Sequence, residues 1–529
     1  FVNNQYNQRI IILKNSDDSR RHLWIVVRIY NQGVAFRYFF SEDTLTGGGH
    51  VLIKEEKTTF EVPENTQCWF APYAQAQYQK LHVDNWPGQA ERPLTLELPN
   101  GIFACIGEAA LVTHSRMKFY TAKNEKNIIR CALYKSVENM GPYATPWRFV
   151  MVAQRPGELL ENNDFILNLN EPNKISNTSW IKPGKIMRVN TFTTAFAKEV
   201  VDFAAKHNMQ YIHFDAGWYG KETFIESDPR KVFSKELDLP EVVAYAKAKG
   251  IGVWLYVNQR ALTKYLDEIL PLYKKWGIAG IKFGFVLVGS QHWTTWLHEA
   301  VSKCAAFNLM VDIHDEYRPT GFSRTYPNLL TQEGVRGNEE FPDANLNCTL
   351  PFTRYVAGAA DYTICYYSRR SLKPGLKNAP ENKVLKNTSG HQLALSVINY
   401  SPLQFLFWYD NPSDYQGEPE IEFFDQLQTV WDESIVINGE IGEHISMARR
   451  SNNKWFVGTI TNNEARSVDI PLYFLNPHKR YKLSIYEDGG ESVPTRTHVK
   501  ISRIIVNSKD VVKVKLPPRG GCAMIAEEL

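Results

Sequence analysis

The stretch TKYLDEILPLYKKWGIAGIKFGFV, residues 263–286, contains a predicted helix followed by a predicted strand. Residues 263–277 have apolar side chains at helical spacing, and Gly277 at their end is typical of a helix C-terminus. Residues 278–286 form a compact apolar run, which predicts a buried strand. A helix that leads back into a buried strand is the unit from which parallel sheets are built.

The same unit occurs three more times. Predicted helices at 192–208, 240–250 and 292–308 end in Asn or Gly and lead into strands at 211–218, 251–258 and 309–316. Four further segments complete the set of candidate strands: IMRVNTF (186–192), NLLTQEG (328–334), LPFTRYV (350–356) and LQFLFWY (403–409). Eight parallel strands close a (β/α)8 barrel of about 250 residues, so we predict a barrel.

The chain on both sides of this region has a different pattern. Short alternating segments broken by Gly, Pro and Asn run from 22 to about 170 and again from about 435, as in β-sandwich domains. A chain of 529 residues also exceeds the usual size of one hydrophobic core. We therefore predict three domains: a β domain at 1–180, the barrel at 181–432 and a small β-sandwich at 433–529.

Composition excludes several classes of partner. The net charge of +3 and the absence of a long basic run give no argument for nucleic acid, and no apolar run is long enough to span a membrane. Seven scattered cysteines suggest neither a disulfide framework nor a thiolate zinc site. The aromatic content of 13% leans toward carbohydrate, because flat rings stack on sugars. Because the sequence starts at Phe1 without a signal peptide, we expect a trimmed amino terminus and export to the periplasm.

In a barrel, functional groups lie where the strands end at the C-terminal face. The polar residues at the predicted strand ends are Asp215 and Trp218, Asn258, Lys282, His314 with Asp315 and Glu316, Glu333 with Glu339, and Asp361. Convergent carboxylates suit glycoside hydrolysis, which needs an acid and a second carboxylate, and they also suit a hard cation. Each residue alone has a simpler interpretation as a helix cap, a loop charge or a hydrogen-bonded structural group.

Several longer segments resemble glycoside hydrolase family 97. They are SWIKPGK (179–185), FDAGWYG (214–220), HDEYRPTGFSRTYPNLLTQEGVRGNE (314–339) and LPFTRYVAGAADYT (350–363), with GEAAL (107–111) and TPWRFVMVA (145–153) in the amino-terminal domain. The resemblance implies a calcium-dependent, exo-acting α-glycosidase with an amino-terminal β-supersandwich, a (β/α)8 barrel and a carboxy-terminal β domain. The family contains retaining α-galactosidases and inverting α-glucosidases.

The resemblance also implies roles for individual residues. Glu339 matches the general acid/base, and Asp315, Glu333, Glu339 and, from the amino-terminal domain, Glu108 match Ca²⁺ ligands. We expect Asp215, Trp218, Lys282 and His314 to bind the substrate, an α-galactoside oligosaccharide.

Gly284 decides the branch. The retaining branch has its nucleophilic Asp where this chain reads GIKFGF, with Gly284 at the Asp position, while the strand that would carry the inverting base ends at Asn258 with no carboxylate nearby. We interpret the chain as a retaining α-galactosidase scaffold without its nucleophile. Hydrolysis would be impaired, and the missing side chain would leave a void, as in a glycosynthase-type variant.

Two alternatives remain open. One is an inverting α-glucosidase that uses Asp315 or Glu316 as its base. The other is a non-catalytic sugar-binding protein, in which Trp218 stacks on a sugar that is never cleaved.

Overall fold

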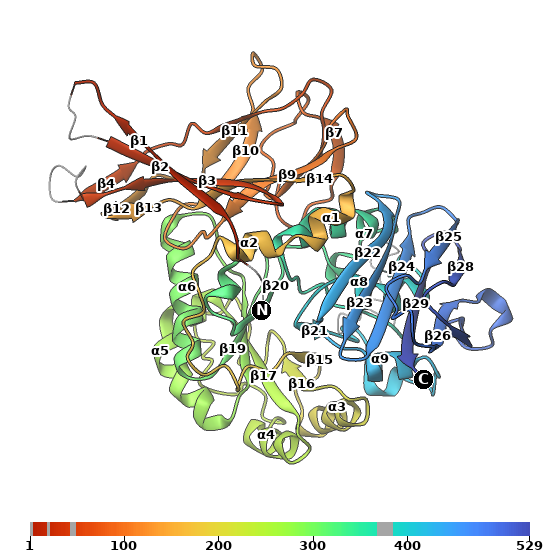
Figure 1. The fold of residues 1–529 in the computed structure, drawn as a ribbon. Helices are drawn as coiled ribbons and strands as arrows, with labels where there is room; N and C mark the ends of the chain where they lie inside the picture. Colours follow the sequence, from red (N-terminus) through yellow and green to blue (C-terminus); the bar gives the residue numbers. More distant parts are fainter. Residues whose placement is uncertain (1–3, 18–21, 43–48, 368–383) are drawn as a thin grey trace.

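The computed structural model describes residues 4–17, 22–42, 49–367 and 384–529. A central barrel carries an amino-terminal β domain over one end and a carboxy-terminal β domain along one side (Figure 1). The barrel strands are β15 (Gly184–Val189), β16 (Tyr211–Phe214), β17 (Gly252–Asn258), β18 (Gly280–Gly284), β19 (Met310–Ile313), β20 (Leu329–Gln332) and β21 (Leu403–Phe405). They form one parallel sheet in the order β20-β19-β18-β17-β16-β15-β21, which confirms the predicted barrel.

The predicted strand at 350–356 is wrong. This segment forms two short 3-10 helices, η4 (Leu350–Phe352) and η5 (Arg354–Ala357). The buried Arg354 guanidinium donates to backbone carbonyls of residues 332, 333, 334, 358 and 359, which wraps the chain around it. The eighth position is filled by an irregular segment, where Asp361 N donates to Gln332 O (3.0 Å) and Ile364 N to Phe405 O (3.0 Å).

The described helices that follow the first barrel strands pack outside the barrel: α3 (Thr194–Lys206), α4 (Leu239–Ala248), α5 (Gln259–Trp276) and α6 (Gln291–Ala306). The residue that ends each predicted helix has a positive φ: Asn208 (50°), Gly250 (75°), Gly277 (83°) and Asn308 (55°). Gly and Asn tolerate this left-handed conformation. The residues that the sequence predicted as helix ends are therefore also the points where the chain turns toward the next strand.

The amino-terminal domain is built around a large antiparallel sheet. Its strands, in order, are β1 (Asn7–Lys14), β2 (His22–Tyr30), β3 (Gly33–Phe40), β14 (Trp147–Ala153), β9 (Phe103–Ala109), β8 (Leu94–Glu97), β6 (Gln67–Phe70) and β7 (Gln79–His82), with β13 (Tyr143–Ala144) beside β3. Smaller sheets pair β10 (Met117–Thr121), β11 (Ile128–Leu133) and β5 (Thr59–Glu61), and β12 (Val137–Met140) with β4 (His50–Ile53). Helices α1 (Pro156–Glu161) and α2 (Asp164–Asn168) lead into the barrel.

The carboxy-terminal domain packs directly against a barrel helix. Its main sheet has the order β22 (Glu433–Glu440), β23 (His444–Ser451), β24 (Lys454–Thr461), β29 (Gly521–Glu528), β26 (Tyr481–Asp488) and β27 (Val499–Val506), with β25 (Arg466–Pro471) and β28 (Val511–Leu516) as a second sheet. Helix α8 (Ser389–Ile398) is buried along its whole length. A Cβ at Gly458 or Gly521 would collide with the α8 backbone, so these two glycines allow the close approach. The remaining short helices are α7 (Ala344–Thr349) and α9 (Ile421–Gln426).

Candidate active site

A buried network of charged groups lies at the C-terminal ends of the barrel strands. Lys282 Nζ on β18 lies 3.5 Å from Asp361 Oδ2, and 4.3 Å from the centre of the Trp408 ring. His314, which follows β19, bridges Asp361 Oδ2 through Nε2 (3.2 Å) and Glu333 Oε2 through Nδ1 (2.9 Å). Burial opposes the charge on Lys282, but the nearby carboxylates of Asp361, Asp215 and Glu339 raise the pKa of its ammonium group. Lys282 therefore stays protonated and holds several carboxylates around it.

A carboxylate cluster suited to a cation adjoins this network. Ligand atoms of His314, Asp315 and Glu333 all lie within 4.8 Å of one another. The Asp315 backbone has a φ of 60°, and this conformation lets its N–H donate to Glu333 Oε2 (2.6 Å) while Oδ2 accepts from Val286 N (3.0 Å). The pKa of Glu333 is raised to about 7, because burial and the carboxylates of Glu339 and Asp315 raise it by more than His314 lowers it. Like charges packed this closely are the environment that a divalent cation relieves.

The fourth predicted ligand lies elsewhere. Glu108 on β9 is fully buried in the amino-terminal sheet, where its oxygens accept from Arg92 and Arg148 and from the Met117 backbone N–H. Two guanidinium groups therefore already neutralise this carboxylate. The structure brings Asp315, Glu333 and Glu339 to one region and does not bring Glu108 to it.

Glu339 lies in the short 3-10 helix η3 (Asn338–Glu340) that follows β20. Burial raises the pKa of its carboxyl group above the ordinary value, His314 and Lys282 oppose that shift, and Asp215 and Asp361 add to it. A carboxyl group whose pKa is raised in this way is suited to donate a proton.

The pKa of the Asp215 carboxyl group is shifted in the opposite direction to that of Glu339. Burial would raise the pKa of this carboxyl group, but Lys282 and Arg188 outweigh burial and hold it at about 2. Arg188 Nη1 also lies 3.4 Å from Asp215 Oδ2. Asp215 therefore stays ionised as an acceptor at the barrel mouth.

The place of the missing side chain at Gly284 is filled by Tyr256. A Cβ built on Gly284 would overlap the ring and hydroxyl of Tyr256, which projects from the neighbouring strand β17. The prediction of a void at this position is therefore wrong. Burial and the carboxylates of Glu222, Asp215 and Asp315 raise the pKa of Tyr256 well above its ordinary value, so its hydroxyl stays protonated.

Trp218 does not offer a stacking surface. Its side chain is 0% exposed, its Nε1 donates to Tyr256 O (2.7 Å), and its ring packs on Tyr219 and Tyr273. The prediction that Trp218 binds a sugar face is therefore wrong. The tryptophan belongs to the core beneath the loop that follows β16.

Sequence reasoning missed Glu222. This carboxylate comes from the loop after β16 and accepts from Asn258 Nδ2 (2.7 Å), Tyr219 Oη (2.9 Å) and Gly217 N (3.0 Å). The expectation of no carboxylate near Asn258 is wrong. Burial raises the pKa of Glu222, the three hydrogen bonds lower it, and Asp215 raises it, with a net upward shift. Nothing in the sequence signals this position, because the loop path that carries Glu222 back to Asn258 has no periodic pattern.

The predicted alternative base Glu316 points toward the amino-terminal domain. Its carboxylate accepts from Ala74 N (2.8 Å) and Gln75 N (3.4 Å), so it fastens the loop after β19 to that domain. Of the two proposed bases, only Asp315 lies in the carboxylate cluster.

A barrel with this acidic mouth, enclosed by two β domains, defines the class of multidomain (β/α)8 proteins with a carboxylate centre. Three family descriptions match the chain: "Glycosyl-hydrolase 97 N-terminal" over residues 1–172, "Glycoside hydrolase 97" over 178–335 and "Glycosyl-hydrolase 97 C-terminal, oligomerisation" over 430–526. The chain belongs to glycoside hydrolase family 97. Among the described residues, the helices are too short or too polar to cross a membrane.

Two of the curated proteins that are similar to this chain are described as alpha-galactosidases. A retaining alpha-galactosidase from Bacteroides thetaiotaomicron is 32% identical over 404 residues, which cover 72% of this chain and 60% of that protein. The match thus spans less than two thirds of that relative. A probable retaining alpha-galactosidase from Streptomyces bingchenggensis is 28% identical over 523 residues, covering 95% of this chain and 77% of that protein.

A solved structure has the same fold. The family 97 enzyme from Pseudoalteromonas sp. strain K8 in complex with acarbose superposes with a TM-score of 0.89 at 25% identity, over 99% of this chain and 88% of that one. The comparison supports the arrangement of all three domains.

Proposed function

We propose that this chain is a calcium-dependent, exo-acting glycosidase for α-galactosides, built on the retaining scaffold and impaired in double displacement. The observation that carries the proposal is the position of Glu339, a carboxyl group with a raised pKa, beside the Asp315–Glu333 cluster. Both curated relatives are named as retaining alpha-galactosidases, and this supports the choice of substrate.

In this proposal Glu339 protonates the glycosidic oxygen as the bond to the anomeric carbon breaks. Asp215, which is partly exposed, accepts hydrogen bonds from sugar hydroxyls, and Lys282 keeps it ionised. The buried Asp361 holds Lys282 and His314 in place. The positive charge that develops on the sugar is stabilised by the surrounding carboxylates.

Asp315, Glu333 and Glu339 would hold the calcium ion, because carboxylate oxygens are its preferred ligands. Bound there, the ion supplies a fixed positive charge that offsets the like-charge repulsion of the cluster. Oxygen donors from two barrel loops, with Glu333 buried among them, suit such a hard cation.

Gly284 is the reason for the impairment. Retention requires a nucleophile opposite the acid, and at residue 284 there is no side chain, while the protonated Tyr256 hydroxyl stands in its place. A neutral phenol is a poor substitute for a carboxylate nucleophile, so turnover by this route should be several powers of ten slower than in a complete enzyme.

A second candidate function rests on Glu222. Its carboxylate lies at the end of β17, the strand where an inverting base would be expected, and its raised pKa suits a general base for water. The chain would then hydrolyse its substrate by single displacement with inversion at the anomeric carbon.

One experiment separates these proposals. The anomer released first from an aryl α-galactoside is followed by proton NMR in the native chain and in Glu339→Gln. Release of α-galactose supports the retaining route, and release of β-galactose supports Glu222 as the base. Sugar binding without any turnover in either chain would contradict both and favour a binding protein.

A further inference from the structure

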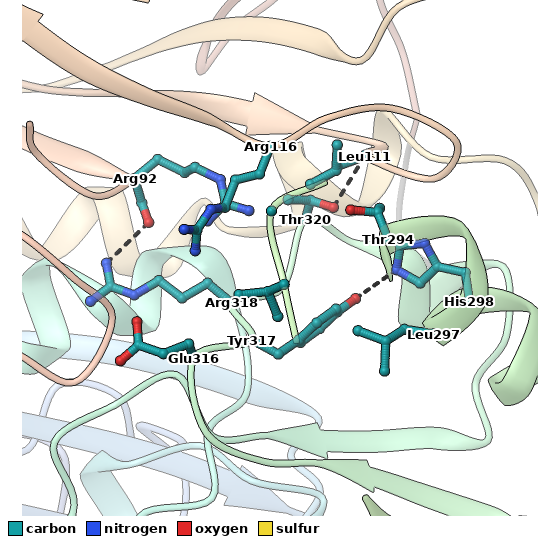
Figure 2. A pocket seen from close by; sticks show the side chains of 12 residues that line it. Arg92, Leu111, Arg116, Thr294, Leu297, His298, Glu316, Tyr317, Arg318 and Thr320 are labelled. Carbon is teal, nitrogen blue, oxygen red and sulfur yellow. Dashed lines mark hydrogen bonds between the residues drawn. The ribbon is translucent and has the colours of Figure 1, made fainter. Parts of the chain in front are cut away.

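A small cavity lies between the amino-terminal domain and the barrel, lined by groups that the proposed chemistry does not use (Figure 2). Arg92 and Arg116 come from the amino-terminal domain, and Glu316, Tyr317 and Arg318 come from the loop after β19. The space admits a body about the size of one water molecule. On the far wall, the Tyr317 hydroxyl hydrogen-bonds His298 Nε2 (2.8 Å) (Figure 2).

Arg116 enters this cavity with unsatisfied donors. The residue is 7% exposed, and within the described chain neither its Nε nor its Nη1 makes a hydrogen bond. Its nearest recorded charge partner is Glu91, whose Oε2 lies 3.4 Å from Nη1. Burying donors of a charged group without acceptors is costly, so a missing acceptor is expected here.

Arg318 brings positive charge, and no carboxylate of the described residues is bonded to it. Its guanidinium donates to three backbone carbonyls: Ala74 O (2.7 Å), Arg92 O (3.0 Å) and Gly334 O (3.2 Å). The bond to Arg92 O crosses from the barrel to the amino-terminal domain beside the cavity (Figure 2). Carbonyl oxygens satisfy these donors but do not neutralise the charge.

Among the described residues, the charged groups around the cavity have one more positive than negative charge. Arg92 forms ion pairs with Glu91 and Glu108. Arg148 forms ion pairs with Glu108 and Glu56. The cationic groups are Arg92, Arg116, Lys118, Arg148 and Arg318, and the carboxylates are Glu56, Glu91, Glu108 and Glu316. Because most of these groups are buried, the surplus charge is poorly screened by solvent.

We propose that this cavity binds a small monovalent anion, with chloride as the occupant in physiological solution. The anion accepts from Arg116 and lies against the charges of Arg92 and Arg318. A water molecule fits the space but does not offset the charge, and a phosphate or carboxylate is too large for it. The bound anion would tie the amino-terminal domain to the loop that begins with Asp315, and so stabilise the docked position of both.

The first test uses the native chain crystallised in bromide, which replaces chloride and gives anomalous scattering. The expected result is an anomalous peak within hydrogen-bond distance of Arg116. If crystals grown in saturating bromide show no anomalous peak in the cavity, the proposal is overturned, whatever the result of the second test.

The second test compares thermal unfolding in chloride and in gluconate at equal ionic strength. We expect the midpoint to be about 2–5 °C higher in chloride, because the anion binds the folded chain only. The difference should disappear in Arg116→Met and persist in the control Arg130→Met, since Arg130 pairs with Glu125 away from the cavity. An unchanged difference in Arg116→Met, or a bromide peak with no anion effect on unfolding, means an adventitious ion only. Either result overturns the proposal and leaves the proposed glycosidase chemistry untouched.

Discussion

The ring of Tyr256 on β17 occupies the space that a side chain at Gly284 on β18 would need. Asn258 is the direct neighbour of Gly284 in the strand register, and Tyr256, two residues earlier, extends along the strand to reach the same level. The space beside residue 284 is therefore taken by a side chain of the neighbouring strand. A side chain introduced at residue 284 would therefore overlap the Tyr256 ring.

Gly284→Asp alone should not restore retaining hydrolysis. The new side chain would collide with the buried Tyr256 ring, at a cost of about 1–3 kcal/mol in unfolding free energy. Gly284→Asp combined with Tyr256→Ala should make room and release α-galactose first from an α-galactoside. Proton NMR of the first product checks this, with Tyr256→Ala alone as the control. Full recovery in Gly284→Asp alone would contradict the overlap.

Glu222→Gln should lower turnover about 10²–10⁴-fold if Glu222 serves as the general base. The amide keeps one acceptor oxygen, which can take the place of Oε2 beside Asn258 or of Oε1 beside Gly217, and it cannot take a proton from water. Steady-state rates on an aryl α-galactoside measure the loss, and Glu226→Gln, an exposed carboxylate in the same loop, is the matched control. An unchanged rate in Glu222→Gln, with correct folding, would remove the inverting route.

Glu339→Gln should impair substrates with poor leaving groups much more than activated ones, because only the former need a proton on the leaving oxygen. The comparison is the ratio of kcat/KM for an alkyl and a nitrophenyl α-galactoside. Glu340→Gln is the neighbouring exposed control. Equal losses on both substrates would argue that Glu339 only orients the sugar.

Chelation of calcium should abolish turnover while far-ultraviolet circular dichroism changes little. Asp315 and Glu333 would be left in contact without a neutralising ion, which displaces the acid but not the sheets. Readdition of Ca²⁺ should restore the rate. Full activity in a chain shown to be metal-free would contradict the proposed ion.

Stability should fall as the pH is lowered from about 6.5 to about 4. Burial lowers the pKa of His114, His298 and His391 to about 4, so in this range the unfolded chain binds protons that the folded chain excludes. In His391→Gln the unfolding free energy should fall less between these pH values, by about 1–3 kcal/mol. The thermal midpoint, measured across the same pH range, should therefore decrease less steeply. The exposed His478→Gln should leave the slope unchanged, and an equal slope in both variants would rule out His391 as a contributor.

The helix and strand alternation could be predicted because its signals are local. Apolar spacing identified the helices and strands, and Asn208, Gly250, Gly277 and Asn308 adopt the left-handed conformation that their residue types favour. The same logic placed Asp315, Glu333 and Glu339 near one another, since the carboxyl ends of parallel strands meet at one face.

The local pattern failed where long-range contacts decide the outcome. The segment 350–356 was predicted as a strand, yet the buried Arg354 binds five carbonyls and the segment forms 3-10 helix. Trp218 reads as a sugar platform at a strand end, but packing against Tyr219 and Tyr273 buries it completely.

The sequence by itself determined the three-part architecture, the family resemblance and the presence of a glycine at position 284, because these depend on residue type and on spacing along the chain. Only the tertiary structure decided what surrounds Gly284: Tyr256 fills the space from the adjacent strand, and Glu222 returns through a loop to meet Asn258. Both contacts depend on strand register and loop path. Neither leaves a periodic signal, because packing across the barrel, not local preference, sets where these side chains lie.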